Sequence, residues 1–418
     1  MRVDLRYGDG SLPIELDSST KAVEPKTVEG HPHPSAELLR VLEHPINSRP
    51  LSEIVSEANS ISIVVNRIEH TQLVQDLLHF LLNSVETFSF NPDDITILYS
   101  IDPDQRVSPE VIDEMLGSPQ SRGHSLVLHD ASSKNHKFVG ETPSHSTPVV
   151  ANERFLCADV KIGLSEIRPD VFSGATGGRM SVLPYVSANR TIRRNAKLRL
   201  LQDAAPFFTS TPSCIDMIEA SQLGGLDFIA NYVADWQGHV AHIFAGNPYS
   251  TWEAGVEAAK PLARADFTRR ADIAIVSAGG FPCDLTLYDA VDSLYAACEV
   301  TEIGGAIVLV AECKDDVGPN GFLRGVSDFS SPEEVTIAAE TSFALGYDKA
   351  KFLWHVLDSR KLVICSRLRR SLVEERFHST SVKDPQEGLE IAKSLLASSN
   401  RVAVLPNGIR AVPVFDIK

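Results

Sequence analysis

The chain has 418 residues, more than a single hydrophobic core usually organises, so we expect two or three domains. Hydrophobic residues make up 43% and charged residues 22%, which is typical of a globular protein and excludes a long disordered chain. The net charge of −16 disfavours binding to nucleic acid or to an anionic membrane surface.

Localisation is inferred from the apolar runs, the N-terminus and the cysteines. No apolar run reaches the length of a transmembrane helix, and the charged, alternating N-terminus does not resemble a signal peptide. The six cysteines are scattered without a C-x-x-C pair, which favours reduced thiols over a disulfide framework or a zinc site. We therefore expect a cytoplasmic protein. We expect its partner to be a small polar molecule, and we leave open whether the chain forms a homo-oligomer.

The first block of the chain predicts strands that alternate with helices. A hairpin is expected from Val3–Tyr7 and Leu12–Leu16, joined by a Gly-Asp-Gly turn. From residue 60 onward, short β-branched apolar runs alternate with segments of helical periodicity. The expected strands are 61–65, 95–99, 125–129 and 159–164, and the expected helices are 72–84 and 109–116.

A second block repeats this rhythm after residue 260. Strands are expected at 271–277, 306–310 and 361–365, with helices at 287–298, 333–343 and 387–398. Such alternation predicts parallel sheets with helices on both faces. We therefore predict a two-domain α/β fold, with domains at 1–260 and 261–418 and a ligand cleft between them.

Four predicted strand ends carry polar or glycine-rich segments, where ligands bind in open α/β sheets. They are residues 65–70, 100–104, 163–180 and 277–282. In the third, Gly174, Gly177, Gly178 and Arg179 form a loop whose backbone N–H groups can approach an anion. A glycine-rich turn needed only for packing is the alternative. The loop fits neither a Walker motif nor a dinucleotide-binding motif.

At this loop the sequence resembles the nickel-dependent lactate racemase family. The similarity runs through Phe172-Ser173-Gly174, Thr176–Arg179, Leu183-Pro184 and, in the second block, Ser277–Pro282 and Leu287-Tyr288. It covers nearly the whole chain. The resemblance implies racemisation of a 2-hydroxy acid by a nickel pincer nucleotide, whose metal-bearing ring accepts a hydride from C2 while a histidine removes the hydroxyl proton.

The sequence departs from the family where the resemblance places the chemistry. The two proton-transfer histidines fall at Asp104 and Asp170, the cofactor-tethering lysine at Met180 and the nickel-binding histidine at Ala196. A lysine of the second domain falls at Asp292, so we expect a positive charge to be lost there. Neither methionine nor alanine can replace the covalent link or the imidazole ligand. Exposed carboxylates titrate near pH 4, far from neutral proton transfer.

These departures leave two interpretations open. One is a remodelled site, in which paired carboxylates serve as acid and base or bind a hard cation. The other is a non-catalytic relative that binds a ligand or a partner. We predict no metal ligands and leave the cofactor unknown. The candidate residues are Asp104, Asp170 and Tyr288 for catalysis, Gly174, Gly177, Gly178 and Arg179 for a cofactor, and Asp292 and Trp354 for substrate.

Overall fold

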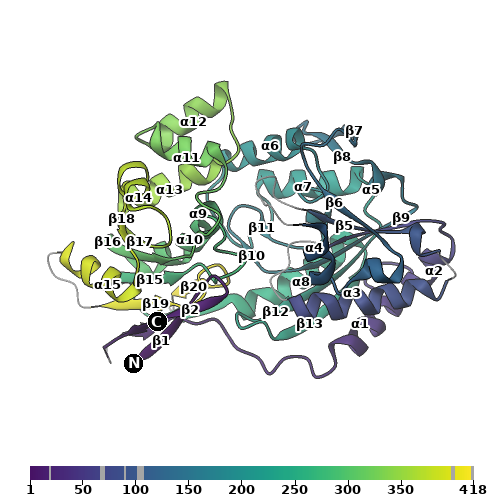
Figure 1. Ribbon diagram of the computed structural model, residues 1–418, viewed down its shortest axis with the longest axis horizontal. Helices are drawn as coiled ribbons and strands as arrows, with labels where there is room; N and C mark the ends of the chain where they lie inside the picture. The colour runs from purple at the N-terminus through teal and green to yellow at the C-terminus, as the bar shows by residue number, and fades with distance from the viewer. Residues whose placement is uncertain (18–19, 66–70, 89–90, 101–107, 397–400, 416–418) are drawn as a thin grey trace.

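The protein folds into two α/β domains, seen side by side in the computed structural model of Figure 1. The structure describes residues 1–17, 20–65, 71–88, 91–100, 108–396 and 401–415. Each domain is built on a six-stranded sheet with helices on both faces, as the sequence predicted. No described helix is both long enough and apolar enough to cross a membrane.

The first sheet has the order β13-β12-β9-β4-β5-β6 and is parallel except for the pairing of β12 with β13. The four strands expected from apolar runs belong to its parallel part, which β12 extends by pairing with β9. The strands are β4 (Ile61–Val65), β5 (Ile95–Ser100), β6 (Ser125–His129), β9 (Val160–Glu166), β12 (Phe228–Ala234) and β13 (Val240–Gly246).

Alternate residues of these strands face different helices, as the two-residue period of a strand requires. Ile63 packs in a core with α1 to α4, whereas its neighbour Val64 packs on the opposite face with α5 and α8. The bounds are α1 (Pro34–Glu43), α2 (Leu51–Ser56), α3 (Thr71–Glu86), α4 (Pro109–Met115), α5 (Glu153–Cys157), α6 (Asn189–Leu198), α7 (Pro212–Leu223) and α8 (Pro248–Ala263). A hairpin of β7 (His136–Glu141) and β8 (Pro148–Asn152) lies beside α5 and α7.

The second sheet is parallel throughout, with the order β18-β17-β16-β15-β19-β3. Its strands are β15 (Ala271–Ser277), β16 (Thr301–Val310), β17 (Lys361–Cys365), β18 (Thr380–Val382), β19 (Val402–Leu405) and β3 (Lys21–Ala22). A separate parallel pair joins β14 (Arg264–Phe267) to β20 (Val412–Phe415).

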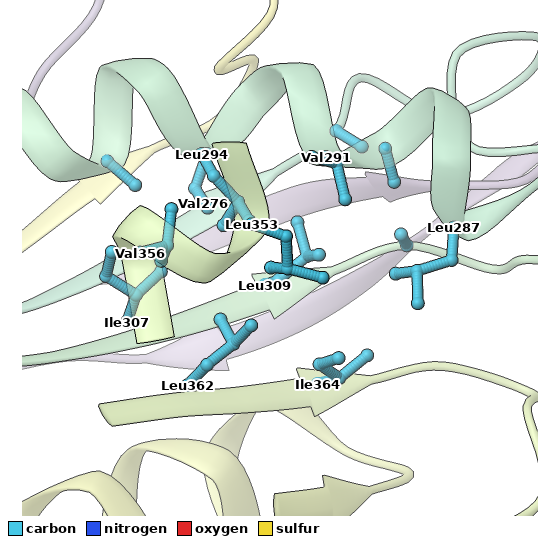
Figure 2. Packing of buried hydrophobic residues seen from close by; sticks show 14 of the residues in the cluster. Val276, Leu287, Val291, Leu294, Ile307, Leu309, Leu353, Val356, Leu362 and Ile364 are labelled. Carbon is cyan, nitrogen blue, oxygen red and sulfur yellow. The ribbon is translucent and has the colours of Figure 1, made fainter. Parts of the chain in front are cut away.

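Figure 2 shows the larger core of this domain, where Ile307 and Leu309 of β16 meet Leu353 and Val356 of α13. The opposite face of the sheet is covered by α15 and the N-terminal hairpin. The helices are α9 (Leu287–Ala290), α10 (Leu294–Val300), α11 (Asn320–Ser327), α12 (Pro332–Thr341), α13 (Tyr347–Ser359), α14 (Arg370–Arg376) and α15 (Pro385–Ser394). The single helix expected at 287–298 is divided by a short 3₁₀ turn, η5 (Val291–Ser293).

The N-terminus lies with the second domain, although the sequence division had placed it in the first. The hairpin of β1 (Arg2–Tyr7) and β2 (Gly10–Glu15) buries Leu5 and Ile14 in the second core, and β3 extends the second sheet. The expected boundary at residue 260 falls inside α8, which ends at Ala263. The hairpin buries its apolar side on a face of the second sheet, and β3 pairs at the edge of that sheet. The order of the elements along the chain does not reveal either position.

Candidate functional site

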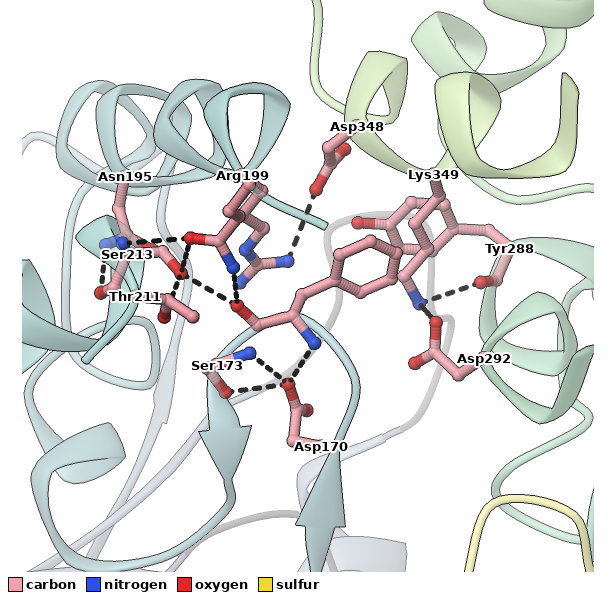
Figure 3. Close-up of polar contacts among 12 residues, drawn as sticks. Asp170, Ser173, Asn195, Arg199, Thr211, Ser213, Tyr288, Asp292, Asp348 and Lys349 are labelled. Carbon is pink, nitrogen blue, oxygen red and sulfur yellow. Dashed lines mark hydrogen bonds and ion pairs between the residues drawn. The ribbon is translucent and has the colours of Figure 1, made fainter. Parts of the chain in front are cut away.

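Charged side chains from both domains meet in one interdomain polar cluster, drawn in Figure 3. The first domain contributes Asp170, from β10 (Pro169–Asp170), and Arg199, the first residue of η4 (Arg199–Leu201) after α6. The second domain contributes the remaining members, which lie on α9, η5 and α13: Tyr288, Asp292, Asp348 and Lys349. The predicted site residues Asp170, Tyr288 and Asp292 are thus brought together.

Asp170 is held by its own loop. Its Oδ1 accepts hydrogen bonds from the backbone N–H of Phe172 at 3.1 Å and of Ser173 at 2.7 Å, and from the Ser173 hydroxyl at 2.7 Å. Burial by itself would raise the pKa of this carboxyl, but the Arg199 guanidinium and the Ser173 hydrogen bonds outweigh burial and lower it. Asp170 is therefore a fixed, ionised carboxylate.

Asp292 has the opposite electrostatic balance. Burial raises its pKa to about 6, Lys349 opposes that shift, and the negative charge of Asp170 adds to it. The Lys349 Nζ lies 2.7 Å from Asp292 Oδ1 and donates to the Tyr288 carbonyl oxygen at 2.9 Å. Tyr288 lies under the same ammonium, 4.1 Å from its ring centroid, and burial raises the pKa of its phenol well above the ordinary value.

Arg199 connects the two domains within this cluster. Its Nη1 lies 3.3 Å from Asp348 Oδ2 across the domain boundary, and its charge also acts on Asp170 and Asp292. Arg199 and Lys349 therefore place two positive charges where the sequence led us to expect the loss of one. Position 292 itself carries a carboxylate, and the Lys349 amine reaches it from α13.

The glycines of the predicted anion loop are explained by packing. A Cβ at Gly174 would lie 2.6 Å from the Phe208 carbonyl oxygen, and a Cβ at Gly178 would lie 2.8 Å from the Ile229 Cδ1. At Gly177 the φ angle is +107° and Ile167 leaves no room for a side chain. The loop is therefore a close-packed corner against the first sheet, which is the packing alternative considered from the sequence.

Two further predicted site residues, Trp354 and Asp104, are not part of this cluster as the structure describes it. Trp354 is buried in the second-domain core, where its indole N–H donates to the Gly325 carbonyl oxygen at 3.1 Å and its ring lies against His378. The structure does not bring Trp354 into the polar cluster of Figure 3. Asp104 lies outside the described residues, as does the predicted strand-end segment 66–70.

The two positions implied for cofactor attachment are both buried. Met180 is buried with Val149, Leu183 and Met217, and Ala196 is buried within α6. The neighbouring Asn195 amide is already used, because it donates to the Ser213 carbonyl and to Asp216 at 2.9 Å each. Among the described residues, no three His, Cys, Asp or Glu side chains are grouped so that they could hold a metal ion.

The glycine-rich strand end of the second domain is also filled by the chain itself. A Cβ at Gly280 would lie 2.8 Å from the Gly8 carbonyl oxygen, and the Phe281 N–H donates to that oxygen at 2.8 Å. The Ser277 hydroxyl donates to the Arg6 carbonyl at 2.6 Å. The turn of the N-terminal hairpin therefore occupies this strand end and leaves the interdomain polar cluster as the candidate site.

Comparison with known proteins agrees with this architecture. The family model for the lactate racemase N-terminal domain matches residues 7–206, and that for the C-terminal domain matches residues 267–413. Lactate racemase from Thermoanaerobacterium thermosaccharolyticum is 26% identical over 386 residues, 89% of each chain. Lactate racemase from Lactiplantibacillus plantarum is 24% identical over 98% of this chain and 99% of its own.

Solved structures show the same fold. The lactate racemase apoprotein from T. thermosaccharolyticum superposes with a TM-score of 0.86 at 24% identity, covering 99% of this chain and all of its own. A protein from Thermotoga maritima superposes with a TM-score of 0.71 at 14% identity, covering 93% of this chain and all of its own. Because the two family models together span most of its length, this chain belongs to the lactate racemase family.

Proposed function

We propose that this protein binds a small hydroxy acid at the interdomain polar cluster and racemises or epimerises it by acid–base chemistry, without the nickel pincer nucleotide. The observation that carries the proposal is that two carboxyl groups, those of Asp170 and Asp292, meet from different domains in one cluster and have different charged partners there. The pKa of Asp170 is lowered, whereas burial raises that of Asp292 to about 6. A pair whose environments separate their pKa values can divide the roles of base and acid.

The two roles follow from the two environments. The ionised Asp170 accepts the proton from the carbon that bears the hydroxyl, and the Asp292 carboxylic acid delivers a proton to the opposite face of that carbon. One C–H bond breaks and one forms, and both carboxyl groups then exchange protons with solvent. The two groups come from different domains, so a ligand held between them would meet them from different sides.

The positive charges support an anionic substrate. Arg199 and Lys349 are held in the cluster by carboxylates, and a substrate carboxylate would share these cations. Negative charge that develops on the substrate during proton removal would be stabilised by the same two groups. With a pKa of about 6, Asp292 is protonated in about a tenth of the molecules at pH 7, so activity should rise as the pH falls toward 6.

The pincer nucleotide does not fit the residues present. Met180 has no amine with which to form the tether, and its side chain is enclosed by apolar neighbours. Ala196 has no lone pair to offer a metal. Attachment as the family resemblance implies would require two side chains that this chain lacks, so no step of the proposed reaction passes through the cofactor.

The test is solvent exchange at the reacting carbon. Purified protein in D₂O should incorporate deuterium at C2 of a single enantiomer from a panel of lactate, glycerate and sugar acids, with loss of optical purity measured by chiral chromatography. Asp170→Asn and Asp292→Asn should each reduce exchange by roughly 10²-fold or more, because each removes one proton-transfer group. Asp358→Asn, at an exposed position of α13, is the matched control and should exchange normally.

Metal content is measured on the same sample. Intact mass should equal that of the unmodified chain, and nickel should be substoichiometric. A stoichiometric covalent adduct that is required for exchange would reject the cofactor-free mechanism.

A non-catalytic ligand-binding relative is the second candidate. It is favoured by the internal pairing of the cluster, since Asp170 is bound by its own loop and Asp292 is paired with Lys349. Calorimetric titration with the same acids separates the two functions. Saturable binding that weakens in Arg199→Met, without any deuterium exchange in the wild type, would support the binding protein and reject the isomerase.

A further inference from the structure

A cavity lies in the first domain, next to the loop that holds Asp170 of the interdomain polar cluster. Its volume is about 310 Å³, and it lies between the C-terminal half of α7 and the N-terminus of α8. None of the cluster residues of Figure 3 lines it. Its wall combines one cation with apolar and amide side chains: Arg179, Ile218, Gln222, Leu226, Asn247 and Trp252.

Arg179 is the unusual member of this wall. It is only 2% exposed and stacks on Trp252, with the guanidinium carbon 3.9 Å from the ring centroid. Its Nη2 donates to the carbonyl oxygens of Ser173 and Ala175 at 2.7 and 3.0 Å. Among the described residues, its Nε and Nη1 have no oxygen acceptor, and the Cys214 thiol is the hydrogen-bonding neighbour of the guanidinium.

The charge of Arg179 is poorly compensated inside the protein. The Cys214 thiol lies beside it, but burial raises the pKa of that thiol, so it remains neutral. Asp170 also acts on the guanidinium, yet its carboxylate is bound by its own loop and acts on Arg199 as well. A buried cation without an adjacent counter-ion carries a large desolvation cost, and an anion in the adjoining cavity would offset it.

The N-terminus of α8 independently favours an anion at the same place. This helix has 16 residues and no acidic side chain in its first turn, so its positive dipole end is not neutralised there. Asn247 caps it by accepting from the N–H groups of Tyr249 and Ser250, and both Asn247 and Tyr249 line the cavity. The cavity therefore lies between a helix N-terminus and an unpaired buried guanidinium.

We propose that this cavity binds a small organic monocarboxylate with a compact apolar body. The carboxylate would lie on the side of the cavity next to the buried Arg179 guanidinium and the N-terminus of α8, and the apolar body would contact Ile218 and Leu226. A volume of about 310 Å³ is at the lower end of ligand pockets and suits a single ring or a short branched acid better than a nucleotide. This site is independent of the reaction proposed for the interdomain polar cluster.

Benzoate is the probe, and benzamide, which has the same shape without the charge, is the matched ligand control. Calorimetric titration of the full chain should show saturable benzoate binding and no benzamide binding. Gln222→Trp, at an exposed position on the rim, should close the cavity and abolish benzoate binding while leaving Arg179 intact. Gln120→Trp, exposed and outside the cavity, should bind benzoate like the wild type.

Arg179→Gln should weaken benzoate binding by about tenfold or more, because the buried positive charge that attracts the carboxylate is lost. If this variant does not fold, the Gln222→Trp comparison still decides the question. Equal benzoate binding by wild type and Gln222→Trp, binding of benzamide as strong as that of benzoate, or no saturable benzoate binding to the wild type would each overturn the proposal.

Discussion

Lys349 and Asp292 form an ion pair in which the Lys349 Nζ lies 2.7 Å from the Asp292 Oδ1. The position of either residue in the sequence does not reveal that the two side chains meet. Asp292 occupies the place where the family resemblance implies a lysine. Lys349, on α13, returns a positive charge to that place. The pair thus joins an acidic and a basic residue that are far apart in sequence.

This pairing predicts the titration of Asp292. Its pKa is raised to about 6 by burial, and the Lys349 ammonium holds it lower than burial alone would. Lys349→Met should therefore raise the pKa of Asp292 further, because the stabilising charge is lost. Carboxyl ¹³C NMR, assigned by comparison with Asp292→Asn, measures both values. Lys393→Met, on the exposed face of α15, should leave the titration unchanged.

Asp292 also predicts a pH dependence of stability. Its pKa in the folded protein, about 6, exceeds the ordinary aspartate pKa of 3.8, so the folded state holds the proton more tightly than the unfolded state does. The stabilisation is fully present below pH 4 and is lost as the pH rises through 6. Asp292→Asn should flatten the urea-unfolding free energy between pH 4 and 6. An unchanged slope over that range would contradict the raised pKa.

Sequence patterns predicted the sheets but only part of the site. The strands β4, β5 and β15 are each a short apolar run in the sequence. The local residue pattern alone was therefore enough to locate them. The contact of Arg199 with Asp348 joins residues separated by 149 positions and depends on how the two domains close. No local pattern encodes that approach, and the sequence therefore missed Arg199, Asp348 and Lys349.

The two domains are also joined by a buried ion pair between Arg410 and Glu166. Arg410 Nη1 and Nη2 donate to the two carboxylate oxygens at 2.6 and 2.8 Å, and both side chains are less than a tenth exposed. Arg410→Ala should lower the free energy of unfolding by about 3–5 kcal/mol, because an unpaired carboxylate remains buried. Chemical denaturation at pH 7 measures the loss.

The control for this prediction removes both charges. Arg410→Met combined with Glu166→Met should recover most of the stability lost in Arg410→Ala, since no buried charge is left unpaired. Arg370→Ala, which breaks an exposed pair with Glu374, should have a much smaller effect. A double variant as unstable as the single one would show that packing, and not the unpaired charge, sets the cost.

A side chain at a glycine of this loop could destabilise the protein in two ways, through backbone strain at a positive φ and through steric overlap of the new Cβ with neighbouring atoms. Gly177 combines both, because its φ is +107° and a Cβ would lie 2.6 Å from Ile167 Cγ1. At Gly178 only overlap is present, with the Cβ 2.8 Å from Ile229 Cδ1, whereas at Gly304 the φ is +81° and no atom lies within 4 Å. We expect Gly177→Ala to cost about 2–5 kcal/mol, Gly178→Ala about 1–3 and Gly304→Ala about 1.

Thermal or chemical unfolding of the three alanine variants tests this order. If Gly177→Ala were as stable as wild type but lost ligand binding, the loop would act on an anion through its backbone, and the packing explanation would fail.

Met180 provides the corresponding test at the implied tether position. Its side chain is 5% exposed and lies in a hydrophobic cluster with Val149, Leu183 and Met217, so a lysine here would bring its amine into apolar surroundings. Met180→Lys should cost about 3–5 kcal/mol in urea unfolding, because an ammonium would be buried without a counter-ion. Met180→Leu keeps the volume and apolar character and should cost less than about 1.5 kcal/mol. Equal stability of the two variants would mean that this position opens to water or to an anion, and the case against a tethered cofactor would then lose its structural basis.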